Sequence, residues 1–138
     1  MKKILLTAAY LFFAIISYAV SVPQIVKDQF AKKFSEAKDV KWSKENKSEY
    51  EAEFNMNGKK YSANYSIKGE WMETEEQIST IELPEAVTAA VKKSHPKSEL
   101  VDADRITNSK GALKYEVVIK SGINKQELLF DAAGNTVK

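Results

Sequence analysis

The chain has 138 residues, of which 43% are hydrophobic and 29% charged, a profile typical of a globular protein that buries a core. It contains no cysteine, which excludes disulfides, thiolate catalysis and cysteine-ligated zinc. Without the two lysines of its N-terminal leader, the basic side chains equal the 19 acidic ones in number, so no general nucleic-acid-binding surface is expected.

The first 19 residues have the pattern of a secretory signal peptide. A basic start precedes an uncharged apolar run over residues 4–16, and Ser17 and Ala19 are small residues at the two positions that signal peptidase reads. The run is shorter than the roughly 20 residues that a membrane span needs. We predict export to the periplasm or the cell exterior with cleavage after Ala19, or alternatively after Ser21, and no membrane attachment afterwards.

The mature chain opens with a predicted helix over residues 23–34. Pro23 suits the first helical position, where its missing N–H costs nothing. One apolar stripe runs along this helix and consists of Ile25, Val26, Phe30 and Phe34. A short strand is predicted around Val40 and Trp42, which alternate with polar residues.

Residues 50–77 predict three antiparallel strands joined by two turns. Aromatic or small apolar residues recur at every second position over 50–56 and again over 61–65. Asn57 and Gly58 favour a type I′ turn, because both of its central residues need a positive φ. A second turn at Lys68-Gly69 leads into a third strand over 70–77. At this period the aromatic stripe is interpreted as core.

The pattern then repeats. Leu83-Pro84 corresponds to Val22-Pro23 at an offset of 61 residues, and Tyr115-Glu116 corresponds to Tyr50-Glu51 at an offset of 65. An insertion of four residues over 108–112 accounts for the change in offset. The chain is therefore predicted to contain a duplicated unit that begins with a helix and continues with up to four antiparallel strands.

These observations predict an α+β fold. Two tandem helix-plus-antiparallel-strand repeats, residues 20–80 and 81–138, are expected to follow the leader (1–19) and to form one continuous antiparallel sheet with both helices on one face. The last strand must be short because the chain stops soon after residue 134.

No catalytic, metal-binding or cofactor-binding motif is found, and none of these sites is predicted. The single histidine, His95, precedes a proline at the end of the second helix, where it complements the helix dipole. Asp102 and Asp104 lack the further ligands of a calcium loop and are interpreted as a solvated strand face. Glu73 and Glu75 resemble a glycosidase pair only in their spacing.

A partner-binding surface is predicted on the sheet face opposite the helices. Strand parity groups Trp71 with Glu73 and Glu75, away from the apolar stripe, while Met72 and Thr74 have the helix-facing parity. The predicted partner-binding residues are Trp71, Glu73, Glu75, Glu51, Glu53, Val118 and Leu129. A bulge or curvature that covers Trp71 would instead make this residue structural.

The motifs together resemble the PepSY-like family of exported bacterial proteins, which has the fold of the beta-lactamase inhibitor protein. The resemblance covers the mature chain and is carried by Trp42 and by the segments over 50–54, 57–59, 69–75 and 115–117, together with Leu83-Pro84. It implies tandem helix-plus-strand units in one curved sheet whose concave face and loops bind or inhibit another protein, often an enzyme. Thr136 replaces Trp71 in the second unit, and no inhibitory residue can be transferred.

We therefore expect an exported, non-catalytic, monomeric domain that binds or inhibits a protein partner in the periplasm or outside the cell. One alternative is a module that binds a small envelope ligand or a peptide, in a deep pocket or by strand addition at a sheet edge. A hydrolase that uses carboxylates such as Glu73 and Glu75 is a further alternative.

Overall fold

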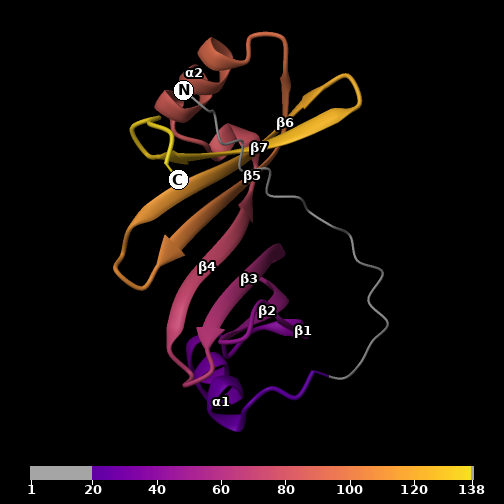
Figure 1. Ribbon diagram of the computed structural model, residues 1–138, viewed down its shortest axis with the longest axis vertical. Coiled ribbons are helices and arrows are strands. Elements are labelled where there is room, and N and C mark those ends of the chain that lie inside the picture. Colours follow the sequence, from indigo (N-terminus) through magenta and orange to yellow (C-terminus); the bar gives the residue numbers. More distant parts are fainter. Residues whose placement is uncertain (1–19, 138) are drawn as a thin grey trace.

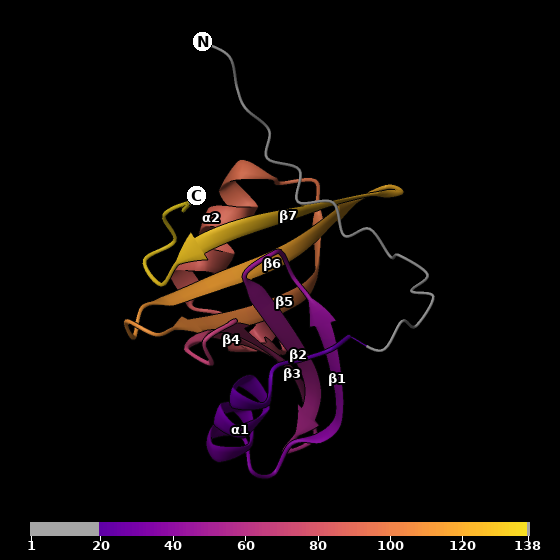
Figure 2. The same ribbon diagram turned by 60° about the horizontal axis from the view of Figure 1, so that its bottom comes forward.

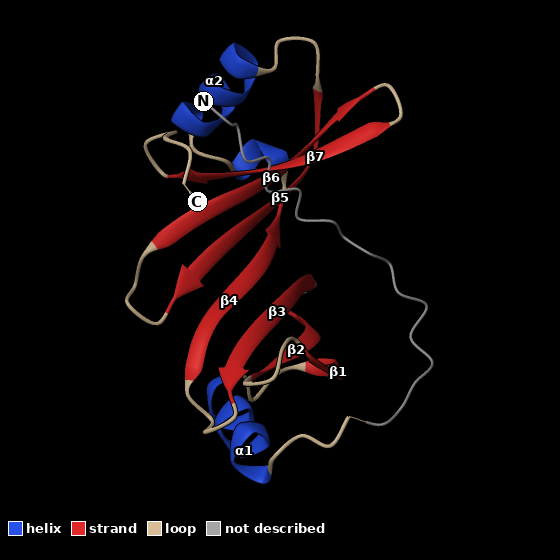
Figure 3. Cartoon of the chain, in the orientation of Figure 1, coloured by secondary structure: helices blue, strands red, loops and turns tan. Residues whose placement is uncertain are grey.

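The computed structural model describes residues 20–137, so the predicted signal peptide lies outside the described residues. Two helices and a seven-stranded antiparallel sheet confirm the predicted α+β class, and the strands follow one another in chain order across the sheet (Figure 1; Figure 3). The elements are α1 (Gln24–Lys33), β1 (Lys38–Lys44), β2 (Glu49–Met56), β3 (Lys59–Ser66), β4 (Trp71–Ile78), a short 3₁₀ helix (Thr80–Glu82), α2 (Glu85–Ser94), β5 (Glu99–Asn108), β6 (Leu113–Ser121) and β7 (Asn124–Asp131). Within residues 20–137, neither helix has the length and hydropathy needed to cross a membrane.

The β2–β3 hairpin sets the register of the first unit. Asn57 and Gly58 have φ angles of 53° and 75°, which confirms the turn predicted from their sequence. Tyr50 lies opposite Tyr65 and Ala52 opposite Ala63, so the alternating apolar side chains of both strands share one face.

The same face continues through the junction between the two units. Ile78 of β4 lies opposite Ala103 of β5, which lies opposite Val117 of β6. Because side chains at paired positions point to the same side, the helix-facing residues of both units belong to one face of the sheet. Both helices therefore cover one face, α1 at one end of the sheet and α2 at the other (Figure 2).

Each helix builds its own hydrophobic core on this face. The first core combines Val22, Val26, Phe30 and Phe34 with Tyr50, Ala52, Phe54, Ala63 and Tyr65. The second core combines Leu83, Val87 and Val91 with Ile78, Ala103, Tyr115, Val117, Ile119 and Phe130. The expectation that Ile25 belongs to the buried stripe is wrong, because this side chain is 46% exposed. It lies over the turn at Gly69 rather than over the strands.

A polar cluster separates the two cores on the helix side. Glu76 of β4 forms salt bridges with Lys59 (2.9 Å) and Arg105, and Lys59 also reaches Glu82 of the 3₁₀ helix (3.4 Å). These are the salt bridges found among the described residues. The charged groups of the helix side therefore have their partners within the chain.

The internal repeat is visible in how each turn after a hairpin packs on a helix. A Cβ placed on Gly69 would lie 3.0 Å from the side chain of Ile25, and one placed on Gly134 would lie 2.4 Å from the carbonyl oxygen of Ala86. The two helix residues are related by the first offset and the two glycines by the second. The second unit has three strands and, in place of a fourth, an isolated bridge between Phe130 and Thr136.

Candidate binding surface on the open face of the sheet

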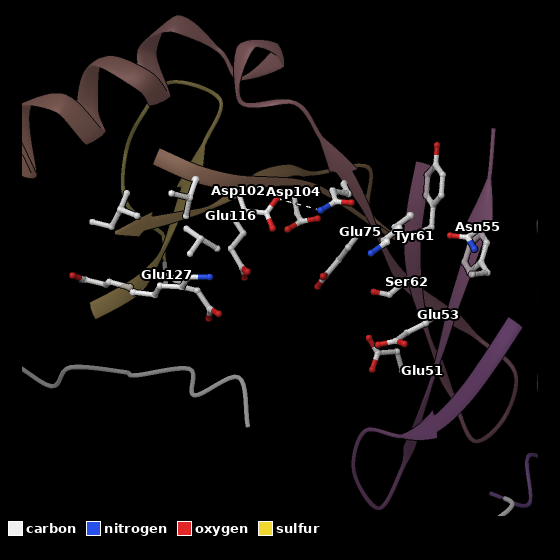
Figure 4. Close-up of a pocket in the computed structure, with 18 of the residues that line it drawn as sticks. Glu51, Glu53, Asn55, Tyr61, Ser62, Glu75, Asp102, Asp104, Glu116 and Glu127 are labelled. Carbon is white, nitrogen blue, oxygen red and sulfur yellow. Dashed lines mark hydrogen bonds between the residues drawn. The ribbon is translucent and has the colours of Figure 1, made fainter. Parts of the chain in front are cut away.

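The face away from the helices contains one large cavity of about 1160 Å³. Every strand contributes to its lining, for example through Lys41, Glu51, Ser62, Glu75, Asp104, Glu116 and Glu127, in order from β1 to β7. Because both edge strands line the same cavity, the sheet must curve around it and this face is concave. Figure 4 shows the labelled carboxylates of both halves around this space.

The lining of the cavity is strongly acidic. It includes three lysines, Lys41, Lys60 and Lys125. It includes eight carboxylates, Asp39, Glu51, Glu53, Glu75, Asp102, Asp104, Glu116 and Glu127. We call this cavity the acidic hollow. Its electrostatic potential is negative although the mature chain is close to neutral, because the strands place their acidic residues on this face.

Three carboxyl groups in the acidic hollow hold their protons unusually strongly. Burial, followed by repulsion from Glu116 and Glu73, raises the pKa of Glu75 to about 8. Burial and the charges of Glu127 and Asp104 raise the pKa of Glu116 to about 7. The pKa of Asp104 rises to about 6 for the same reasons, burial first and then the charge of Asp102.

Neutral groups supply the side-chain hydrogen bonds of the hollow. Ser43 Oγ donates to Glu51 (3.4 Å) and Gln77 Nε2 donates to Asp102 (3.3 Å). Burial also raises the pKa of Glu127, whose Oε2 is buried and accepts no hydrogen bond. The surface is therefore able to accept hydrogen bonds and positive charge that the chain itself does not supply.

Within residues 20–137, no group of three or more histidine, aspartate or glutamate side chains has the arrangement of a metal site. His95 caps the C-terminus of α2, and its Nδ1 lies 2.8 Å from Ser94 Oγ. It does not line the acidic hollow. The geometry therefore favours recognition rather than acid–base chemistry at the histidine.

Most of the predicted partner-binding residues lie on this face. Glu51, Glu53, Glu75 and Val118 line the acidic hollow. Glu73 pairs with Asn64, and Leu129 pairs with Glu116, so both are on the same side of the sheet but outside the lining. Their role in binding a partner stays a prediction.

The predicted position of Trp71 on the open face is wrong. Asn64 of β3 pairs with Glu73, but the next residue, Tyr65, pairs with Trp71, so Met72 is an extra residue in β4. This β-bulge reverses the parity at the start of the strand and turns Trp71 to the helix side. Met72, expected to face the helices, is 37% exposed.

Trp71 is a structural residue of the first core. Its ring packs against the core cluster, with Lys33 Nζ 3.8 Å from the ring centroid. Its Nε1 donates a hydrogen bond to Thr74 Oγ1 (2.8 Å). The indole therefore combines apolar packing, a cation–π contact and a satisfied N–H.

We expect the substitution Trp71→Ala to lower the free energy of unfolding by about 2–4 kcal/mol, because it empties a half-buried aromatic site. Met72→Ala, at the exposed bulge position next to it, is expected to cost less than about 1 kcal/mol. Urea denaturation of both variants measures the difference. Equal and small losses would show that Trp71 does not belong to the core.

The sequence analysis missed the acidic residues of the second unit that line the hollow. Asp102 and Asp104 do share a face, as predicted, but Asp104 is half-buried rather than part of a solvated strand surface. Glu116 is the counterpart of Glu51 at the offset of 65 residues, and this correspondence was a signal for its role. No local pattern indicates that curvature brings these side chains towards the first unit.

A family model described as "Putative beta-lactamase-inhibitor-like, PepSY-like" matches residues 15–62 and again residues 48–138. No curated protein matches the chain.

Several solved structures have a similar fold. "Putative periplasmic proteins" from Bacteroides eggerthii are 20% identical, with a TM-score of 0.79 and coverage of 86% of this chain and 88% of that one. A DUF2874 family protein from Bacteroides uniformis is 22% identical, with a TM-score of 0.77 and the same coverage. A BLIP-like protein from Bacteroides fragilis is 21% identical, with a TM-score of 0.71 and coverage of 86% and 85%. At these identities the likeness extends to the fold.

Proposed function

Because the chain belongs to the PepSY-like, beta-lactamase-inhibitor-like family whose model it matches over both halves, we propose that it is an exported, non-catalytic domain that binds another protein through the concave face of its sheet. The acidic hollow is the observation that carries this proposal. It offers a recessed surface built from all seven strands, whereas the helices cover the opposite face.

The size and lining of the acidic hollow favour a protein partner. Its volume, about 1160 Å³, exceeds the 300–1,000 Å³ typical of clefts for small molecules. Its lining is mainly polar and charged, whereas sites for small ligands are mostly apolar. The family description names an inhibitor, so we propose that the partner is an enzyme and that binding inhibits it.

The predicted leader and one neighbour described as periplasmic support a location in the periplasm or outside the cell. We also propose that the protein binds its partner as a monomer.

The proposal is tested by affinity capture with variants that block one face or the other. Ser62 lies in the acidic hollow, and Ala89 is an exposed residue of α2. Immobilised wild-type protein and Ala89→Trp should retain the same protein from an envelope extract of the producing cells. Ser62→Trp should retain at least about tenfold less of it, because a bulky side chain at the centre of an interface costs more than about 1.4 kcal/mol.

Both variants add the same side chain, and neither changes the charge. Quantitative mass spectrometry of the retained proteins measures the outcome. If the two variants lose the captured protein equally, or if the wild type enriches nothing relative to Ser62→Trp, the concave face is not the binding surface.

A further inference from the structure

The two faces of the sheet differ in how their charged groups are satisfied. On the helix side, Glu76 is paired with Lys59 and Arg105. In the acidic hollow, no carboxylate of the described chain has a lysine or arginine within salt-bridge distance, although three lysines line the same cavity. The buried Oε2 of Glu127 lacks even a neutral donor.

We propose that the segment of the partner that fills the acidic hollow is cationic, an extended stretch or loop of protein with at least two arginine or lysine side chains that reach Glu75 and Glu116. This inference rests on the proposed function and specifies the chemistry of the partner. Glu75 comes from β4 and Glu116 from β6, and both point into the space between the two halves of the sheet (Figure 4).

The reason for a cationic partner is desolvation. A neutral or apolar partner that covered this face would remove water from unpaired carboxylates and return nothing in exchange. Arginine restores what is lost, because its planar guanidinium donates two parallel hydrogen bonds to one carboxylate. The hollow also accommodates more than one such side chain, since acidic groups line it from β1 to β7.

The protons held in the hollow give this binding a pH dependence. A cation interacts best with ionised carboxylates, so it lowers their pKa values and releases protons when it binds. Affinity should therefore rise with pH through the range set by the pKa values of Asp104, Glu116 and Glu75, about 6 to about 8. The charged groups that face these three are Glu51, Glu73, Asp102, Glu127 and the lining lysines Lys41, Lys60 and Lys125.

Isothermal titration of the mature chain with a hexa-arginine peptide tests the proposal. We expect binding that weakens between about 50 mM and about 200 mM salt, because screening reduces attraction between exposed charges. The double variant Glu75→Gln/Glu116→Gln should bind the peptide at least about tenfold more weakly. Hexa-glutamate, titrated in the same way, should not bind.

The matched control changes the net charge equally but outside the hollow. Glu36 and Glu85 are exposed and do not line the cavity, and the variant Glu36→Gln/Glu85→Gln should alter affinity by less than about twofold. Equal losses in the two double variants would overturn the proposal, because the peptide would then sense only the overall charge. Affinity that falls as pH rises from about 6 to about 8 would also overturn it.

This inference and the proposed function fail in different ways. If the envelope protein is captured through Ser62 but Glu75→Gln/Glu116→Gln retains it as well as the wild type does, the function stands and the cationic partner does not. If hexa-arginine binding depends on the hollow while no protein is captured, the charge preference stands and the protein-binding function fails.

Discussion

Replacing Glu75 with glutamine is expected to raise the free energy of unfolding by about 2–4 kcal/mol at about pH 9. The pKa of this carboxyl is about 8 in the folded chain and 4.5 ordinarily, so the folded state binds a proton that the unfolded state has lost. Stability therefore falls as pH rises from about 4.5 to about 8. Glutamine has the same shape and no charge, so it removes this penalty.

The next residue along β4 should respond with the opposite sign. Burial alone would raise the pKa of Glu76, but hydrogen bonds from Lys59 and Arg105 outweigh burial and lower it. This carboxylate contributes stability above its ordinary pKa, and the contribution is lost as pH falls through the lowered value. Glu76→Gln should cost about 1–2 kcal/mol near neutral pH, discounted because Lys59 and Arg105 are more than a third exposed.

Urea denaturation of the two variants and the wild type at about pH 4 and about pH 9 measures both effects. Glu75→Gln should match the wild type at the lower pH, where the glutamate is protonated in both states, and exceed it at the higher pH. A Glu75→Gln variant whose advantage is the same at both values would show that the hollow does not hold this proton.

Gly134→Ala is expected to lower the free energy of unfolding by about 3–5 kcal/mol, because two costs combine. Gly134 has a φ of +81°, which strains any residue with a Cβ, and the added Cβ would lie 2.4 Å from the carbonyl oxygen of Ala86. The backbone of α2 must therefore move away from the turn after β7. The second core, which this helix covers, would lose packing as a result.

Gly122 provides the control for the conformational cost alone. Its φ is +61°, and a Cβ there would meet nothing within 4 Å. Gly122→Ala should therefore cost only about 1 kcal/mol. Thermal or urea unfolding followed by circular dichroism compares the two variants. Similar losses would contradict the close approach of the helix to this turn.

Local signals in the sequence predicted the parts of the fold that depend on local physics. Asn57-Gly58 predicted its turn because few residue pairs adopt two successive positive φ angles cheaply. The correspondence of Pro84 with Pro23 predicted the repeat, because equivalent helices begin in the same way. Register then followed from alternation, since a slip by one residue would expose a whole apolar face.

The features that escaped prediction are those with no local signature. The bulge at Met72 contains no glycine or other indicative residue, so parity counted from Glu73 placed Trp71 on the wrong face. The acidic hollow depends on sheet curvature, which brings Glu51 and Glu116 to one cavity although 65 residues separate them. Alternation indicates which residues share a face but not how strongly that face bends.

The unpaired carboxylates weaken the fold and are the reason to assign binding to this face. Charged groups that are buried together raise one another's pKa values and lower stability near neutral pH. Proteins commonly accept such costs where function requires them. The helix side, with its paired Glu76, lacks this conflict.

The binding face itself can be identified by site-specific photo-crosslinking, because the chain has no cysteine and a single one can be introduced and labelled. Gln77 lines the acidic hollow, and Lys93 is exposed on α2. Gln77→Cys with a photoreactive label should crosslink to one protein in cells that produce the chain, and labelled Lys93→Cys should not. Crosslinking from Lys93→Cys with none from Gln77→Cys would contradict a partner bound in the concave face.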